Sequence, residues 1–414
     1  MAMGGLGRAF TGLWSASTTS ALGSGLTTVA APLLVATRSD DPMVVAASFV
    51  AAWLPWLLFA LPGGVLVDRV DRRRLMLLID VVRVVALAVL AAAVATGYAE
   101  VALLYSVLFI VNAGEVVFRS ASQALVPAVV PKERLERANG LLFGGAMFAQ
   151  GILAGPVGGF LFAVAACLPF FVNAGTYAAS AVFLGLVAGT YRVKAKPGKR
   201  SVRAEVAEGF RWLMGSRLLR TMSILMGLLN LTLTAATAIL VLLAKERLHL
   251  GSVGFGLLFT CMAAGGLFGS VVGERIIAKI SSTWTIRGGL VVEAGTHLAL
   301  ATVDSPLAIG AVLFAFGVHS ALWGIVASSL RQRLVPAGLL GRVGSVGLFI
   351  AAGGNCAGGF LGGALAAKFG LTAPYWVGFV VAAVVTAATW RVFNRATIAA
   401  AYESAGDDAQ LAQQ

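Results

Sequence analysis

The sequence consists of long apolar stretches separated by short segments that contain most of the charged residues. Each stretch holds about 20 residues, the length that a helix needs to cross a hydrocarbon core of roughly 30 Å. The pattern therefore predicts twelve membrane-spanning helices. We place them at residues 12–37, 43–67, 75–96, 101–126, 139–165, 168–190, 219–243, 252–273, 285–303, 305–330, 340–366 and 372–393.

The amino-acid composition is far more apolar than that of a soluble protein. Hydrophobic residues make up 59% of the 414-residue chain and charged residues only 12%, with a mean hydropathy of +0.90. A soluble domain carries about 25% charged residues, so we expect an all-α integral membrane protein. The formal net charge of +13 is typical of basic loops beside anionic lipid headgroups. We therefore expect membrane lipid, and no nucleic acid, as a partner.

The sequence contains none of the common motifs for enzymatic or metal chemistry. Cys167, Cys261 and Cys356 lie far apart in apolar stretches without CxxC spacing, so neither a metal site nor a disulfide framework is indicated. Walker A, HExxH and Gly-x-Ser-x-Gly sequences are also missing. We therefore expect a protein that is not an enzyme and that uses no cofactor and no metal.

The distribution of lysine and arginine predicts the orientation of the chain. With twelve spans, both termini lie on the same side of the membrane. That side receives most of the basic residues, whereas the opposite side receives only Arg38, Lys245, Arg247 and Lys368. Because cytoplasmic loops are enriched in lysine and arginine, we predict a multi-pass protein of the inner (plasma) membrane with both termini in the cytoplasm.

Two sequence echoes indicate an internal repeat at about half the length of the chain. LVPAVVPKERLERANG is echoed by RLVPAGLLGRVGS, which aligns Pro131 with Pro336 at an offset of 205 residues. GGVLVDR is echoed by GSVVGER, which aligns Arg69 with Arg275 at an offset of 206 residues. Nearly equal offsets from separate matches predict two six-helix halves arranged as parallel repeats.

The predicted domain boundaries follow from this repeat. A basic segment with the amphipathic run EVAEGFRWLMGSRLL separates the two halves. The resulting parts are an N-terminal six-helix half, a cytoplasmic linker with an amphipathic helix, a C-terminal six-helix half and a cytoplasmic tail. They cover residues 1–190, 191–218, 219–393 and 394–414.

The charged loop between the second and third predicted spans is similar to a family signature. Its sequence GGVLVDRVDRRRLM contains the pattern G-x-x-x-D-R-x-x-R-R, formed by Gly64, Asp68, Arg69, Arg72 and Arg73. With twelve spans in two repeats, the chain resembles the major facilitator superfamily, whose signature has a glycine where Asp71 stands here. The linker sequence EGFRWLMGSRLLR and the turn that begins at Pro131 resemble the enterobactin exporter and macrolide efflux group.

The resemblance implies that this loop closes the cytoplasmic side of a transporter. Asp68 can cap a helix or pair with the arginines, while Arg72 and Arg73 can bind carboxylates or helix C-termini of the other half. The five motif residues would then form a conformational latch. The alternative is that the cluster only sets the orientation of the chain.

The fourth predicted span carries a polar face within an otherwise apolar segment. Ionisable groups inside a membrane are costly and mark a pathway, a pair or a relay. At 100° per residue, the polar residues fall within about 100° of arc; they are Asn112, Glu115, Arg119, Ser122 and Gln123. The resemblance implies a cavity lined by spans one, four, seven and ten, where Glu115 exchanges a proton and Arg119 tunes its affinity. A static Glu115–Arg119 ion pair is the alternative.

Polar residues also occur in other predicted spans. The expected cavity also receives side chains from spans seven and ten, namely Asn230, Thr234, Thr237, His319 and Trp323. His319 is equally compatible with a buried core histidine. We expect Glu293 and His297 in span nine to form a structural pair, and Asp80 and Arg83 in span three to extend the loop cluster.

The fifth predicted span contains a glycine motif that bears on the direction of transport. GILAGPVGGF resembles the G-x-x-x-G-P-x-x-G-G signature of proton-coupled exporters through Gly151, Gly155, Pro156 and Gly159, and departs from it at Phe160. The resemblance favours export over uptake. The alternative is general close packing of small residues.

The function implied by the resemblance is secondary active transport. We expect a monomeric antiporter that exports a small amphipathic molecule, such as a drug, an antibiotic or a siderophore, in exchange for protons by alternating access. A proton symporter and a translocator of lipid-like substrates are alternatives on the same fold. A receptor or assembly partner that transports nothing is a more distant alternative.

Overall fold

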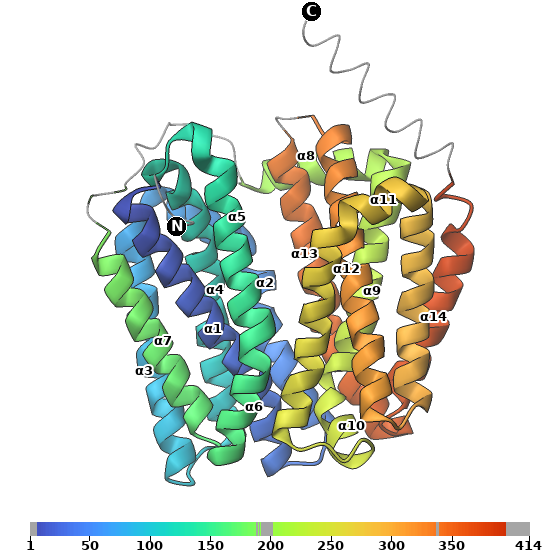
Figure 1. The fold of residues 1–414 in the computed structure, drawn as a ribbon, viewed down its shortest axis with the longest axis horizontal. Coiled ribbons are helices and arrows are strands. Elements are labelled where there is room, and N and C mark those ends of the chain that lie inside the picture. Colours follow the sequence, from blue (N-terminus) through green and yellow to red (C-terminus); the bar gives the residue numbers. More distant parts are fainter. Residues whose placement is uncertain (1–5, 188, 190, 192–201, 337–338, 395–414) are drawn as a thin grey trace, which may run out of the picture. The chain divides into compact units, whose positions relative to one another are not determined.

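The computed structural model describes residues 6–187, 189, 191, 202–336 and 339–394, and all regular elements within them are helices (Figure 1). The first group is α1 (Gly7–Arg38), α2 (Pro42–Arg69), α3 (Arg72–Ala95), α4 (Val101–Val129), η1 (Lys132–Arg134), α5 (Leu135–Ala146), η2 (Met147–Leu153), α6 (Ala154–Val164) and α7 (Leu168–Gly185). The second group is α8 (Val202–Gly215), α9 (Arg217–Ala238), α10 (Leu240–Glu246), α11 (Ser252–Thr302), α12 (Pro306–Leu334), α13 (Leu340–Phe369) and α14 (Ala373–Thr389).

The helices have the length and apolar composition of membrane spans. Within the described part of the chain, ten helical segments are long and apolar enough to cross a membrane. The 51-residue helix α11 covers both the eighth and the ninth predicted spans, and the 17-residue helix α14 corresponds to the twelfth. The all-α membrane fold is therefore confirmed, whereas the number of twelve spans stays a prediction.

Helix α11 is interrupted at Ser281, which separates it into two segments. The φ of 72° and ψ of 157° at this residue lie outside the helical region, and a positive φ is costly for a residue with a Cβ atom. The hydroxyl of Thr285 donates a hydrogen bond of 2.8 Å to the carbonyl oxygen of Ser281. The two segments agree with the separate spans that the sequence predicts at 252–273 and 285–303.

The chain divides into two compact units. Unit 1 consists of Met1–Gly198 and Leu240–Thr260, and unit 2 consists of Lys199–Ile239 and Cys261–Gln414. Helix α10 and the first turns of α11 thus pack with unit 1, although they follow the linker in sequence. The half boundaries drawn from the sequence repeat stay a prediction.

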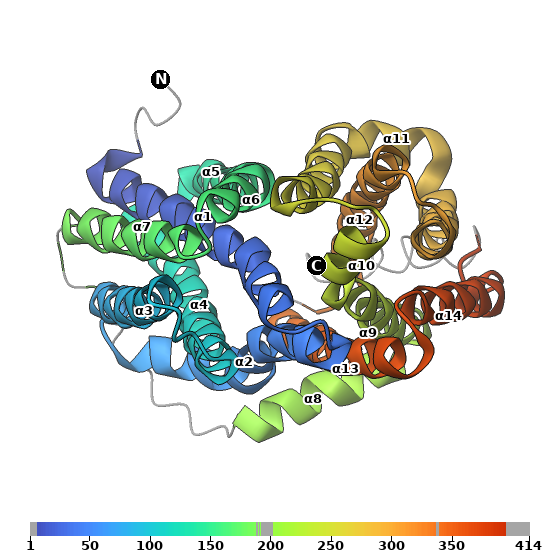
Figure 2. The same cartoon turned by 90° about the horizontal axis from the view of Figure 1, so that it is seen from below.

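Unit 1 is organised around α1, α3, α4 and α7. Helix α1 packs against α7 and α6, α3 packs against both α4 and α7, and α2 packs along α4 (Figure 2). Helices α4 and α7 therefore flank α3, whose buried charged residues lie in the middle of the helix.

Helices α5 and α6 are joined without a break by the π-helical segment η2. Pro156 follows this segment by three residues, and a proline cannot donate the backbone hydrogen bond that the carbonyl four residues earlier would accept. The backbone instead widens, and the N–H of Ala154 reaches the carbonyl oxygen of Ala149, five residues back. The proline of the glycine motif therefore lies directly beside this irregular geometry.

Unit 2 contains a seam of small residues between α9 and α13. Gly354, Gly358 and Gly362 recur every four residues on α13. A Cβ atom on any of them would overlap the backbone carbonyl groups of Gly227, Leu231 and Ala235, respectively, on α9. Such small-residue spacing lets two membrane helices approach closely, so this seam fixes the packing of α9 against α13.

We predict that Gly358→Leu destabilises the protein by about 1–3 kcal/mol, because the added side chain must push α13 away from α9. The measurement is the thermal unfolding midpoint of the purified protein in detergent. The matched control is Gly347→Leu on the same helix, where a Cβ atom would meet no described atom within 4 Å. Equal midpoints for the two variants would contradict the role of the seam.

Candidate functional site

A fully buried arginine lies in the interior of unit 1. The Arg83 side chain on α3 has no exposed surface. Its Nη2 atom donates a hydrogen bond of 3.0 Å to Oε2 of Glu115 on α4. Its Nη1 atom lies 3.7 Å from Oδ1 of Asp80 and donates a bond of 3.3 Å to the hydroxyl of Ser20 on α1. The guanidinium therefore joins three helices.

Aromatic rings and hydroxyl groups complete the surroundings of Arg83. The guanidinium lies 4.7 Å from the centre of the Tyr177 ring and 5.3 Å from that of Phe118, distances at which a cation is attracted to a π system. The Ser24 hydroxyl donates to Glu115 Oε2 at 3.1 Å and lies 3.0 Å from the Tyr177 hydroxyl. We call this group the Arg83 cluster; its polar members are Ser20, Ser24, Asp80, Arg83, Glu115, Tyr177 and Ser180.

The two carboxylates of the Arg83 cluster differ in their access to solvent. The Asp80 side chain is fully buried and accepts a hydrogen bond of 2.7 Å from the Ser180 hydroxyl on α7. The Glu115 side chain is 18% exposed. Arginine stays protonated, so two ionised carboxylates would leave one excess negative charge. A proton on one carboxyl group would restore neutrality, and Glu115 is the more accessible of the two.

A glycine makes the approach of Arg83 to Glu115 geometrically feasible. Gly114 precedes Glu115 on α4, and a Cβ atom there would lie 2.7 Å from Arg83 Nε and 3.0 Å from a methyl carbon of Ile79. Any larger residue would displace α3 or the guanidinium. The sequence pair Gly114–Glu115 therefore supplies both the space and the charge that hold Arg83.

The partner of Glu115 differs from the one expected from spacing along α4. Arg119 is exposed, and its guanidinium lies over the ring of Trp56 on α2, 5.9 Å from the ring centre. Glu115 pairs with Arg83 instead, because Arg83 is buried against α4 and needs a carboxylate. Asp80 and Arg83, expected to extend the loop cluster, are likewise part of this interior group.

The remaining polar residues of α4 do not join the Arg83 cluster. The Asn112 amide donates to the carbonyl oxygen of Leu108 at 2.9 Å, so it is satisfied within its own helix. The hydroxyl of Ser122 lies 3.0 Å from that of Ser17 on α1, and Gln123 is exposed. The polar face of α4 therefore contributes one residue, Glu115, to the ionisable site.

The arginines of the loop motif bind backbone carbonyl groups inside unit 1. Arg72 donates to the carbonyl oxygen of Ala124 on α4 at 2.8 Å. Arg73 donates to the last carbonyls of α7, those of Leu184 at 2.8 Å and Gly185 at 2.9 Å. Cations at a helix C-terminus are favourable because they face its partial negative charge. The arginines thus fasten α3 to α4 and α7, where the sequence suggested contacts with the other half.

Asp71 has a specific role at the position where the family signature has a glycine. Its carboxylate accepts hydrogen bonds from the backbone N–H of Arg74 at 2.9 Å and of Tyr191 at 2.6 Å. It therefore caps the N-terminus of α3. Arg69 is exposed. Gly64 and Asp68 belong to α2, and the side chain of Asp68 lies outside the part of the structure that is described.

Unit 2 brings together three ionisable residues that the sequence places on two predicted spans. Glu293 and His297 lie on α11 and His319 on α12, and all three are buried. Nε2 of each histidine lies 3.6 Å from a different carboxylate oxygen of Glu293. The centre of the Trp323 ring lies 6.5 Å from that of His319. We call Glu293, His297 and His319 the Glu293 cluster.

The polar residues of α9 are satisfied by hydrogen bonds with nearby groups of unit 2. Thr234 donates to the side-chain oxygen of Asn355 on α13 at 2.8 Å. Asn230 donates to the Met226 carbonyl oxygen at 2.8 Å, and Thr237 donates to that of Leu233 at 2.9 Å. The sequence analysis did not single out Asn355, although a polar asparagine among glycines and alanines indicates a hydrogen bond to another helix.

The glycines of the exporter-like motif pack against the start of α11 within unit 1. A Cβ atom on Gly155 would overlap Thr260 and the carbonyl of Gly256, and one on Gly159 would overlap the carbonyl of Ser252. Gly151 lies in the π-helical segment η2 and Pro156 in α6. The motif therefore forms a close helix contact.

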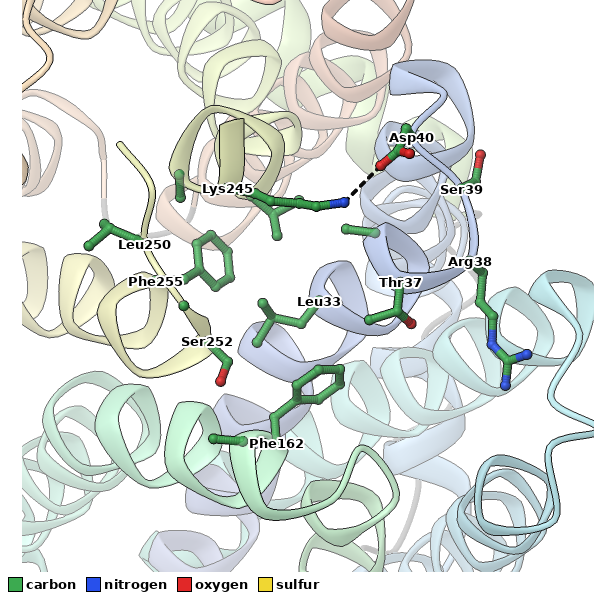
Figure 3. A pocket seen from close by; sticks show the side chains of 15 residues that line it. Leu33, Thr37, Arg38, Ser39, Asp40, Phe162, Lys245, Leu250, Ser252 and Phe255 are labelled. Atoms are coloured by element: carbon green, nitrogen blue, oxygen red, sulfur yellow. Dashed lines mark hydrogen bonds and ion pairs between the residues drawn. The ribbon is translucent and has the colours of Figure 1, made fainter. Parts of the chain in front are cut away.

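Unit 1 also contains a cavity of about 550 Å³ between α1, α6, α10 and the start of α11 (Figure 3). Its wall includes Leu33, Phe162 and Phe255. At its edge, Lys245 donates a hydrogen bond of 2.9 Å to the carboxylate of Asp40. Ligand sites commonly have such volumes and combine an apolar wall with a few polar groups. The pairing of Asp40 with Lys245 was not predictable, because the two residues are 205 positions apart.

Comparison with known protein families matches nearly the whole chain to one family. The sequence profile described as transmembrane secretion effector matches residues 6–410. An uncharacterised MFS-type transporter of Mycobacterium tuberculosis is 27% identical over 333 residues, which cover 75% of this chain and 73% of the relative. Macrolide efflux protein A of Streptococcus pyogenes is 28% identical over 128 residues, which cover 31% of this chain and 32% of the relative.

Solved transporter structures share the fold at low sequence identity. A bacterial homologue of the iron transporter ferroportin has a TM-score of 0.75 and 16% identity, with 94% of this chain and 99% of that chain covered. The nucleoside transporter NupG has a TM-score of 0.72 and 13% identity, with 93% of this chain and 98% of that chain covered. At these identities the likeness is one of fold.

We predict that Arg83→Met destabilises the protein by about 3–5 kcal/mol, because it leaves Asp80 and Glu115 without their buried cation. Thermal unfolding of the purified protein measures the loss. Arg119→Met is the control and should cost no more than about 1 kcal/mol, as for an exposed cation–π contact. Equal losses in the two variants would contradict the proposed importance of the buried pair.

Proposed function

The chain belongs to the transmembrane secretion effector family of the major facilitator superfamily, and on this basis we propose that it exports a small amphipathic molecule in exchange for protons. Family membership makes the protein a multi-pass membrane transporter of small molecules. The direction, the coupling ion and the class of substrate are the proposal. The observation that carries it is the Arg83 cluster, in which one permanent cation faces two carboxylates.

Glu115 is the proposed proton carrier. Its partly exposed carboxylate is hydrogen-bonded to Arg83 and Ser24, so a proton that binds to it weakens both interactions at once. Because these interactions join α1, α3 and α4, protonation would change the relative stability of two helix arrangements. A substrate that binds better to the deprotonated arrangement would promote proton release. By linkage, protons would then promote substrate release, as antiport requires.

Export of an amphipathic substrate is supported by independent features of the chain. One relative bears the name macrolide efflux protein A, and the glycine motif at Gly151–Gly159 resembles that of exporters. The cavity of unit 1 combines aromatic and aliphatic side chains with the Asp40–Lys245 ion pair at its edge. A wall of this kind suits a molecule that has both an apolar body and a polar group.

The proposed orientation places both termini and the linker in the cytoplasm of an inner-membrane protein. The basic residues of the loop motif and the linker support this orientation through the positive-inside rule. We further propose that one chain is the functional unit, because each six-helix half supplies one side of the transport path in this superfamily.

The proposal is tested first by a growth assay with macrolides, cationic dyes and siderophores. Cells that express the chain should tolerate at least one of these compounds better than cells without it. An uncoupler should restore its accumulation to the level of the control cells. Greater accumulation in the expressing cells would favour a symporter, and binding without any flux would favour a receptor.

We predict that Glu115→Gln abolishes uphill export driven by a pH gradient, because the amide keeps the shape of the side chain but cannot exchange a proton. The measurement uses purified protein in liposomes and the compound identified by the growth assay. Downhill exchange of this compound should remain measurable.

The matched control is Glu133→Gln, which neutralises an exposed carboxylate outside the predicted spans and should export at the wild-type rate. Wild-type uphill export by Glu115→Gln would place the proton site at another residue. Loss of downhill exchange as well would indicate a damaged fold.

We predict that single cysteines introduced between residues 202 and 215 are labelled by an impermeant maleimide only after the membrane is permeabilised. The helix α8, Val202–Gly215, carries part of the basic linker that the positive-inside rule retains in the cytoplasm. A cysteine at Arg247, on the opposite side in the predicted topology, should be labelled in intact cells. The reverse pattern would invert the proposed orientation.

A further inference from the structure

The Glu293 cluster places three titratable side chains in the interior of unit 2. Glu293 is 3% exposed, His297 is 1% exposed and His319 is 7% exposed. The two histidines approach the same carboxylate from different helices, one from α11 and one from α12. Ionisable groups at such depth in a membrane protein are costly and commonly functional.

Among the described residues, the ionic contacts of Glu293 are the two histidines, and none is a lysine or an arginine. On α12, His319 is flanked by the rings of Phe316 and Trp323. On α14, Gly378 faces His297, and the buried phenol of Tyr375 lies one turn earlier. Arg287, the preceding basic residue of α11, donates to the Trp390 carbonyl oxygen at 2.6 Å. The charge of Glu293 therefore has only the imidazoles to balance it in this part of the structure.

Some buried polar atoms of the Glu293 cluster make no hydrogen bond. The distance of 3.6 Å between each Nε2 atom and the carboxylate exceeds the hydrogen-bond range. Glu293 Oε1 and His297 Nδ1 are buried without a hydrogen-bond partner. Buried polar groups are normally satisfied, so the cluster has room to tighten when a proton is added.

Glycines on neighbouring helices provide the space for both imidazole rings. A Cβ atom on Gly289 of α11 would overlap the ring of His319, and one on Gly378 of α14 would overlap the ring of His297. Larger residues at either position would force the rings out of place. The surrounding helices are therefore shaped to accommodate both histidines.

The internal repeat relates this cluster to the one in unit 1. Gly289 stands 206 positions after Arg83, and His319 stands 205 positions after Gly114. These are the offsets of the two sequence echoes. In unit 1 the ionisable residue lies on α3 and the glycine on α4, whereas in unit 2 the glycine lies on α11 and the ionisable residue on α12. Each repeat thus packs an ionisable side chain against a glycine between corresponding helices.

We propose that Glu293, His297 and His319 form a second proton-binding site, which takes up one proton from water between the carboxylate and the two imidazoles. With the proton bound, the cluster is neutral; without it, the cluster carries one negative charge. A contribution of this site to antiport rests on the proposed function, whereas proton binding itself does not.

The histidine content of the chain permits a direct test. The sequence has three histidines, and the third, His249, is exposed between α10 and α11. The full chain labelled with ¹⁵N-histidine is placed in lipid nanodiscs with EDTA, and its imidazole signals are followed by NMR from pH 5 to pH 9. His249→Gln assigns the reference signal.

We expect the His297 and His319 signals to change together over one pH range, separately from His249. Glu293→Gln removes the charge that retains the proton, so both cluster rings should remain neutral while His249 titrates as before. In His319→Asn the joint change should be lost at His297, which tests the site if Glu293→Gln does not fold. Glu115→Gln should leave all three titrations unchanged, because it lies in the other cluster.

Two results would overturn the inference. One is that the His297 and His319 rings stay neutral throughout the titration of the wild-type protein, or that they titrate in Glu293→Gln as they do in the wild type. The other is a joint change that occurs only when Zn²⁺ replaces EDTA, which would identify a metal site. Failure of the proposed function would be seen differently. Export would not depend on the pH gradient, while the joint histidine titration would still be observed.

Discussion

Hydrocarbon offers a buried charge neither hydrogen bonds nor effective screening, so a membrane protein must balance such charges with its own groups. Arg83 meets this constraint in unit 1 by contacting Glu115, Asp80 and Ser20. Tyr177 and Ser180 extend the network to α7. Helices α1, α3, α4 and α7 are consequently held at one point by a single guanidinium.

Close packing around these buried side chains depends on glycines of the neighbouring helices. Gly114 allows Arg83 to reach α4, and Gly289 allows His319 to reach α11. In both repeats a large residue packs against a glycine. The large residue lies on α3 in unit 1 and on α12 in unit 2. The ionisable residue at this contact is an arginine in unit 1 and a histidine in unit 2. The two contacts therefore share the pairing of a large side chain with a glycine but differ in their charge.

The sequence predicted the fold well because length and hydrophobicity directly determine membrane helices. It singled out ionisable residues such as Glu115, Glu293 and His319, because a charge or an imidazole within an apolar stretch is conspicuous, but it assigned Arg83 to the loop cluster. It could not predict their partners. Spacing along α4 suggested Arg119 for Glu115, but the rotation of α4 against α3 directs Glu115 to Arg83. Partners that come from different helices depend on helix rotation and contact distance, which hydrophobic periodicity does not specify.

Magnitudes indicate which of the observed interactions can drive a conformational change. To move a two-state equilibrium from 1:99 to 99:1, a ligand must favour one state by about 5.5 kcal/mol. The Asp40–Lys245 pair has side chains that are 74% and 53% exposed, and exposed pairs contribute at most about 1 kcal/mol. Breaking a buried pair by removal of one charge costs about 3–5 kcal/mol. The exposed pair can therefore only bias a transition, and the interactions that drive one must come from buried charges such as those of the Arg83 cluster.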